Sequence, residues 1–135
     1  FDKEVLIYLI QCTSPFLQSD DLLKSFELIK SSSFEYNSLI SGYFFNKFIW
    51  EKKEEVQGWT PINYDPKERP RSQDKDPLFI ENGSFYVFGS SNLRKTNCRI
   101  HGNVGIFEMQ SIRSIDIDNQ EDLDYASFIF DYIKR

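Results

Sequence analysis

The sequence predicts an α/β fold, and two observations lead to this class. Segments with the apolar pattern of a strand alternate with segments that have the spacing of an amphipathic helix, and no internal repeat is present. Hydrophobic residues make up 40% of the 135 residues and include 13 phenylalanines, which is enough apolar material for a core. We therefore expect one domain in which helices pack against a sheet.

The first two elements are predicted near the N-terminus. Residues 4–11, EVLIYLIQ, form a nearly continuous apolar run, which is typical of a strand buried on both faces in a parallel sheet. Pro15 ends this run. A helix is predicted from about Asp20 to Lys30, because acidic residues occupy its first turn and a lysine occupies its last. Its apolar face is predicted to consist of Leu22, Phe26 and Ile29.

The composition changes in the middle of the chain. Residues 37–45 and 47–52 are predicted to be strands, the second of them short and more exposed. Residues 53–77 then hold most of the prolines and many charges, together with Trp59 and Tyr64. This segment is too aromatic for a plain linker. We predict an extended arm or long loop that serves a function or a partner.

The last part of the chain returns to alternating strands and helices. The alternating aromatic residues of 83–89 predict a strand, and residues 90–97 suit a short helix that begins at a serine. Residues 103–109 and 111–117 suit two more short strands. Residues 119–135 are predicted to form a helix. The apolar face of that helix is predicted to consist of Leu123, Ala126, Phe130 and Ile133.

Charge and cysteine usage restrict the kind of protein. The net charge of −5 and the pI of about 4.9 argue against nucleic acid as the main partner, because phosphate backbones need a basic face. The longest apolar run, residues 5–10, is too short to span a bilayer, so no membrane partner is expected. Cys12 and Cys98 suggest no disulfide framework, which favours a reducing cytoplasm. The chain opens on Phe1 rather than methionine, and we expect a piece of a longer protein.

Two aspartates near the C-terminus, Asp116 and Asp118, have two interpretations. Residues i and i+2 of a strand point to the same side with Cα atoms roughly 6–7 Å apart, so both carboxylates could bind one Mg²⁺ ion. Ligands of open α/β sheets bind at this end of the strands. Alternatively, Asp118 and Glu121 form a capping box for the last helix. The spacing alone favours the capping interpretation and leaves both open.

Other polar residues are weaker candidates. Gln11 follows a predicted strand and could face a ligand or belong to a polar turn. Arg71 and Gln73 lie in the charged segment, where an arginine could bind a carboxylate or phosphate but is usually solvated. Asn82 and Gly83 are typical of a tight turn.

Three further chemistries find little support. Cys12 and His101 could form a nucleophilic pair, but no third residue that would orient the histidine is evident. One histidine and two scattered cysteines do not suit a zinc site. Neither common glycine-rich phosphate-binding pattern is present.

Three segments combine into a specific pattern, although each is weak alone. They are LIQCTSPFLQSDDL, NYDPKERPRSQDKDPLFIENGSFYVF and RSIDIDNQEDLDYA, and the match spans residues 4–126. In this order they resemble the motifs of the acylneuraminate cytidylyltransferases, the CMP-sialic acid synthetases. The corresponding family motifs are Gln-x-Thr-Ser-Pro after a central strand, Arg-x-Gln-Asp with Glu-Asn-Gly-x-x-Tyr, and Ser-Ile-Asp-Ile-Asp with Glu-Asp-Leu.

The resemblance implies a fold and a reaction. The fold would be a nucleotidyltransferase-type, Rossmann-like three-layer sandwich. In the reaction, the anomeric hydroxyl of a nonulosonic (sialic-acid-like) sugar attacks the α-phosphate of CTP, which yields a CMP-sugar and pyrophosphate and requires Mg²⁺. Asp116 and Asp118 match the family's metal-binding and catalytic aspartates.

The resemblance also implies sugar-binding residues and a dimer. Gln11 matches a glutamine that contacts the sugar, and the block that contacts the acid sugar includes Arg71, Gln73, Asn82 and Tyr86. The segment 46–77 resembles the family's dimerisation arm, so a cytoplasmic homodimer is expected.

The chain departs from the family at several positions. Ser72 stands where many relatives have an arginine, which touches the sugar in some of them, so Arg71 is the expected substitute. Trp50 stands where the family has a lysine. Arg99 and Ile100 replace two aromatic residues that line the N-acyl pocket in some relatives. The identity of the acid sugar therefore stays open.

The largest departure is an absent motif. The glycine-rich basic loop that holds the CTP phosphates in the family is not among residues 1–135. We therefore expect the chain to be the C-terminal portion of a single cytidylyltransferase domain, inactive when alone. The alternative is a noncatalytic homologue, or a binding or dimerisation module on the same scaffold.

Overall fold

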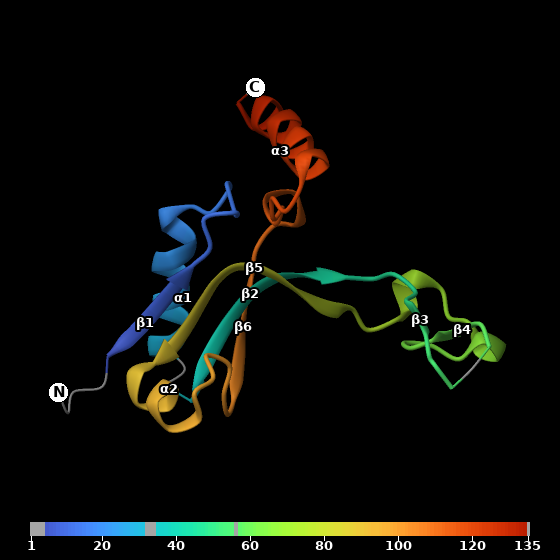
Figure 1. The fold of residues 1–135 in the computed structure, drawn as a ribbon, viewed down its shortest axis with the longest axis horizontal. Coiled ribbons are helices and arrows are strands. Elements are labelled where there is room, and N and C mark those ends of the chain that lie inside the picture. Colours follow the sequence, from blue (N-terminus) through green and yellow to red (C-terminus); the bar gives the residue numbers. More distant parts are fainter. Residues whose placement is uncertain (1–4, 32–34, 56, 135) are drawn as a thin grey trace. The chain divides into compact units, whose positions relative to one another are not determined.

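A computed structural model describes residues 5–31, 35–55 and 57–134 (Figure 1). The chain divides into two compact units. The first comprises Phe1–Tyr43 and Ile80–Arg135, and the second comprises Phe44–Phe79. The predicted arm, residues 46–77, lies within the second unit, and its role in a dimer stays a prediction.

The first unit is built on a mixed sheet with the strand order β1-β5-β2-β6. Strand β1 pairs antiparallel with β5, whereas β2 and β6 are parallel, which confirms the α/β class. The bounds of the elements with residues in this unit are β1 Leu6–Ile10, α1 Ser19–Ser31, β2 Ser38–Phe45, β5 Leu78–Gly89, α2 Ser90–Thr96, β6 Val104–Glu108 and α3 Gln120–Ile133.

Helix α1 packs against one face of this sheet and closes a hydrophobic core. Ile29 of α1 is 3% exposed and contacts a core cluster from the strands. The strand-side members of that cluster are Leu39, Phe85, Val87, Phe107 and Met109. The predicted helix is confirmed, and Leu22 also packs on the core, but Phe26 is 43% exposed. The three-layer, Rossmann-like arrangement stays a prediction.

Strand β1 corrects one prediction. The run at residues 4–11 does form a strand, but it pairs antiparallel with β5, with Leu6 opposite Gly89 and Ile10 opposite Phe85. It is also not buried on both faces, since Leu9 is 36% and Ile10 is 47% exposed. The physical reason is its place at the end of the strand order, where only one neighbouring strand covers it in the described part of the chain.

The segment between β6 and α3 is the main error of the sequence prediction. Residues 111–117 do not form a strand, because Ser111–Arg113 make a 3₁₀ turn and residues 114–117 have no regular structure. The turn is closed by local bonds, with the Arg113 amide donating to the Gln110 carbonyl at 2.9 Å. Asp116 and Asp118 therefore do not share one side of a strand.

Helix α3 is confirmed, but its cap and its face differ from the prediction. Asn119 is the N-cap, and its side chain and that of Asp122 form the capping box, in place of Asp118 and Glu121. On the predicted apolar face Ala126 is 4% exposed. The other three members of that face are 44% to 50% exposed, namely Leu123, Phe130 and Ile133. Within the described chain no helix has the length and apolar character of a membrane span.

The second unit contains a small hairpin, where the sequence predicted a short strand at 47–52 followed by an extended arm or long loop. Strand β3, Trp50–Lys52, pairs antiparallel with β4, Trp59–Pro61, and two 3₁₀ turns follow at Pro66–Glu68 and Ser72–Asp74. The ring of Phe48 lies 4.6 Å from that of Tyr64. This aromatic contact explains why a proline-rich, charged segment has an ordered structure.

Candidate functional site

A pocket of about 340 Å³ lies in the first unit, beside the middle of β5 and the segment that follows β6. It brings together three residues that the sequence analysis singled out from two motifs, Asn82 and Tyr86 from one and Asp116 from the other. The remaining lining residues are Tyr43, Ile80, Glu81, Gly83 and Ser114. We refer to it as the Asp116 pocket.

Gly83 gives the pocket its shape. Asn82 and Gly83 do not form the predicted turn between elements, because β5 begins at Leu78 and runs through both residues. Gly83 has φ +70°, a left-handed conformation inside the strand. A Cβ atom at Gly83 would lie 3.6 Å from Oδ2 of Asp116, so the carboxylate lies directly beside this glycine.

Asp116 carries an unmatched buried oxygen. Its Oδ1 atom is buried and has no hydrogen-bond partner among the described residues. The segment is held by the amide of Ile117, which donates to the Thr13 carbonyl at 3.0 Å. A buried carboxylate oxygen without a partner is costly, and a bound cation would remove that cost.

Asp118 lies in a different environment from Asp116. It is exposed, and its backbone amide donates to Oδ2 of Asp122 at 3.0 Å in the turn that begins α3. It is not among the lining residues of the pocket in the described chain. No group of three or more His, Cys, Asp or Glu side chains that could hold a metal occurs in the described residues. A Mg²⁺ site needs fewer, since one or two carboxylates and substrate phosphates suffice.

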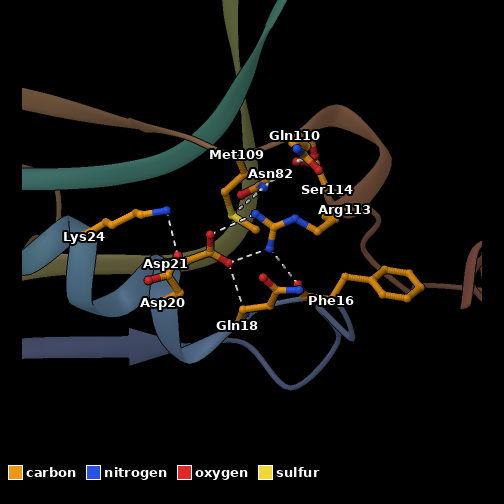
Figure 2. Close-up of polar contacts among 10 residues, drawn as sticks. All are labelled: Phe16, Gln18, Asp20, Asp21, Lys24, Asn82, Met109, Gln110, Arg113 and Ser114. Carbon is orange, nitrogen blue, oxygen red and sulfur yellow. Dashed lines mark hydrogen bonds and ion pairs between the residues drawn. The ribbon is translucent and has the colours of Figure 1, made fainter. Parts of the chain in front are cut away.

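Asn82 ties three parts of the first unit together (Figure 2). Its Oδ1 accepts hydrogen bonds from Oγ of Ser41 at 2.8 Å and from the Ser84 amide at 3.1 Å. Its Nδ2 donates to Sδ of Met109 at 3.3 Å and to Oγ of Ser114 at 2.9 Å. Both ends of this buried amide are therefore occupied by protein groups, and Asn82 holds the pocket wall.

Tyr86 forms another wall of the pocket and carries two polar contacts. It is 4% exposed, and its hydroxyl donates a hydrogen bond to Oε1 of Glu81. Burial and this hydrogen bond raise the pKa of Tyr86 above its ordinary value of 10.0. The guanidinium carbon of Arg99 lies 4.1 Å from the centre of the Tyr86 ring. Tyr86 is thus a protonated donor with a cation against its ring.

A buried ion pair anchors the segment that carries Asp116 (Figure 2). Arg113 donates from Nη1 and Nη2 to the two carboxylate oxygens of Asp21, at 2.7 and 2.9 Å. The Arg113 and Asp21 side chains are only 14% and 7% exposed. Arg113 also donates to the Phe16 carbonyl at 3.2 Å. The pair holds Arg113 in place. Ser114, the next residue, contacts Asn82, and Asp116 follows two residues later, so the pair anchors the segment that carries Asp116.

The pKa of Asp21 reflects this contact. Burial alone would raise it, but the hydrogen bonds from Arg113 and from the Gln18 amide, with the charge of Arg113, outweigh burial and hold the pKa below 3.8. Sequence reasoning did not find this pair, because its members are 92 residues apart. Both lie in the quoted segments, Asp21 in the first and Arg113 at the start of the third, but nothing in the sequence pairs them. Sequence reasoning also missed Glu81, although Glu81 precedes Asn82 in the quoted block.

The other predicted site residues are not in the pocket lining. Gln11 is half-buried, and its backbone amide donates to the Ser84 carbonyl at 3.0 Å. Arg71 and Gln73 are exposed residues of the second unit. Nε of Arg71 lies 2.7 Å from Oδ2 of Asp74 in a local ion pair. The predicted roles of all three in sugar binding stay predictions.

The fold and the pocket define an α/β unit with a carboxylate-lined site, and the comparison with known proteins shows which enzymes the sequence resembles. The chain is 35% identical over 111 residues to the N-acylneuraminate cytidylyltransferase of Oncorhynchus mykiss. It is likewise 35% and 32% identical over 111 residues to N-acylneuraminate cytidylyltransferases A and B of Danio rerio. The resemblance predicted from the three motifs is confirmed.

The alignments cover most of this chain but only a small part of each relative. Each alignment covers 81% of this chain, but the chain spans only about a quarter of the length of the curated relatives it matches (25%, 25% and 26%). No family model matches the chain. The activity and the substrates of a whole enzyme are therefore matters of proposal.

Proposed function

We propose that this chain is part of a cytidylyltransferase that activates a nonulosonic, sialic-acid-like sugar with CTP and releases pyrophosphate. The observation that carries the proposal is the meeting of Asn82, Tyr86 and Asp116 in one pocket, although they come from two distant motifs. The names of the relatives support the same reaction class. The proposed enzyme is a cytoplasmic nucleotidyltransferase.

Asp116 is the proposed ligand of Mg²⁺, and its unmatched buried oxygen fits that role. Asp118, two residues later, is proposed as the second carboxylate of the family motif. When bound, the ion would offset phosphate charge and orient the phosphates for in-line attack. The protein's own contribution is positional, because the Arg113–Asp21 pair and the Ser114–Asn82 contact hold the Asp116 segment beside Gly83.

On the sugar side, Tyr86 supplies a protonated hydroxyl and Asn82 a rigid wall, as argued from their contacts. Gln11, Arg71 and Gln73 are proposed to contact the acid sugar. A homodimer whose interface includes residues 46–77 is part of the same proposal, supported by the exposed Trp50 and Trp59 of the second unit, which are 45% and 65% exposed.

The metal assignment is tested with Asp116→Asn. Mn²⁺, used as a paramagnetic substitute for Mg²⁺, should broaden the NMR signals of the residues that line the Asp116 pocket, and Asp116→Asn should remove this effect. Asp124→Asn on α3 is the matched control, because Asp124 is exposed and, within the described part of the chain, its side chain bonds only to that of Gln120. Equal broadening in Asp116→Asn would refute the metal site. In the parent enzyme, Asp116→Asn and Asp118→Asn should abolish turnover.

A noncatalytic binding or dimerisation module is the second candidate. It is favoured by the exposed aromatic side chains of the second unit and by the lack of a common phosphate-binding glycine pattern in these 135 residues. Pyrophosphate release from CTP and N-acetylneuraminate by the parent protein distinguishes the candidates, because only the enzyme would release it. We expect no release from residues 1–135 alone. The coding sequence upstream of Phe1 separates the two: a basic glycine-rich loop there supports the enzyme, and a start codon directly before Phe1 supports the module.

A further inference from the structure

The charge of the Asp116 pocket poses a problem for an acidic ligand. The two ionisable carboxylates in its lining are Asp116 and Glu81, and no lining residue in the described chain is a cation. A ligand carboxylate would be repelled by both groups. A bound metal ion can offset this repulsion beside Asp116, but the wall formed by Glu81 and Tyr86 needs a positive charge from the protein.

Arg99 is the cation in contact with that wall. Its guanidinium carbon lies 4.1 Å from the centre of the Tyr86 ring, and its positive charge lowers the pKa of Tyr86 against the larger effects of burial and Glu81. Arg99 is an exposed residue. A guanidinium stacked on a ring keeps the N–H groups of its edge free for a carboxylate. Arg99 is therefore both positioned by Tyr86 and able to bind an anion.

Two other arginines show why Arg99 is the available one. Arg113 is buried and bonded through two nitrogens to Asp21. Arg71 is paired with Asp74. By contrast, no carboxylate of the described residues forms an ion pair with Arg99. Arg99 is thus a cation next to Tyr86 that has no carboxylate partner among the described residues.

We propose that Arg99 binds the carboxylate of the acid ligand in the Asp116 pocket and selects acidic over neutral ligands. This inference rests on the proposed function, since it assigns the group that recognises the acid of the sugar. Arg99 is a specificity-determining residue in this assignment, and Tyr86 positions it. Arg99 stands where some relatives have an aromatic side chain, and it adds a carboxylate-binding group to the sugar contacts proposed for Arg71.

The experiment compares an acid with its neutral ester. Binding of N-acetylneuraminate and of its methyl ester to the 135-residue chain is measured by NMR titration, with Mg²⁺ present. The unaltered chain should bind the acid more tightly than the ester. Arg99→Gln, which keeps much of the stem over Tyr86, should weaken acid binding by about tenfold or more and leave ester binding unchanged. Arg99→Lys should bind the acid with intermediate affinity, because it keeps the charge and loses the fork.

Lys95→Gln is the matched control, since it removes one positive charge from an exposed residue of α2 near Arg99 in the sequence. It should leave both affinities unchanged. Unchanged acid binding by Arg99→Gln would overturn the assignment while the proposed function stands. Equal losses for acid and ester would also overturn it, because a structural role affects both. If the unaltered chain binds neither compound, the sugar side of the proposed function fails and the role of Arg99 fails with it.

Discussion

Two ion pairs, one from each unit, differ sharply in burial and in sequence separation. In the first unit Arg113 and Asp21 are 92 residues apart, and their side chains are 14% and 7% exposed. In the second unit Arg71 and Asp74 are three residues apart, and their side chains are 76% and 46% exposed. Both pairs have a shortest N–O distance of 2.7 Å. Ion pairs with the same shortest N–O distance therefore have different effects. The pair in the first unit holds distant segments together, and the pair in the second unit holds only a local turn.

The largest expected effect is the loss of the buried pair. Arg113→Ala should lower the free energy of unfolding by about 3–5 kcal/mol, because it leaves the buried Asp21 carboxylate without its partner. Urea unfolding followed by circular dichroism measures this change. The double variant with Asp21→Ala should lose less than the sum of the single variants. A loss below about 1 kcal/mol for Arg113→Ala would show that the pair does not anchor the Asp116 segment.

A smaller effect is expected from acid. The pKa of Asp21 is held below 3.8 in the folded chain, so the pair contributes its full stability above that value. This contribution should be lost as the pH falls from 3.8 through the lower pKa of the folded state. The urea midpoint of the unaltered chain should thus decrease over this range more than that of Asp21→Asn. Parallel pH profiles of the two proteins would contradict the shift.

The smallest effect is expected in the second unit. Arg71→Ala should change the free energy of unfolding by less than about 0.5 kcal/mol, because an exposed ion pair is screened by water and salt. The measurement is the same urea titration, repeated at high salt, where no further change is expected. If Arg71→Ala lowered the free energy of unfolding about as much as Arg113→Ala, the two pairs would not differ in strength as their exposure indicates.

Local patterns were sufficient for several elements of the fold. Helix α1 was predicted within one residue of its ends, because the spacing of apolar residues and the acids of its first turn act over a few residues. Strand β5 was predicted from its aromatic alternation, although it begins five residues earlier than expected, at Leu78. Asn82, Tyr86 and Asp116 were found through motifs, and the fold brings them into one pocket.

Other features depended on contacts that no local pattern encodes. The sequence of residues 111–117 alternates like that of a strand. In the structure, however, Arg113 is the last residue of a 3₁₀ turn, and its side chain bonds to Asp21, which is distant in the sequence. Whether Asn119 or Asp118 caps α3 depended on which side chain could bond the amide of Asp122. Likewise, the antiparallel pairing of β1 depended on β5 as its neighbour.

By itself, the sequence determined the α/β class, the main helices and the resemblance to N-acylneuraminate cytidylyltransferases, since these depend on short-range spacing and on motif order. Only the tertiary structure decided that Asp116 lies beside Gly83 with one oxygen unmatched, that Asp118 lies apart from it, and that Arg99 stacks on Tyr86. The reason is physical. Whether a charged side chain is buried, and which group it pairs with, depends on residues that are close in space but far apart in the sequence. No local pattern in the sequence encodes those contacts.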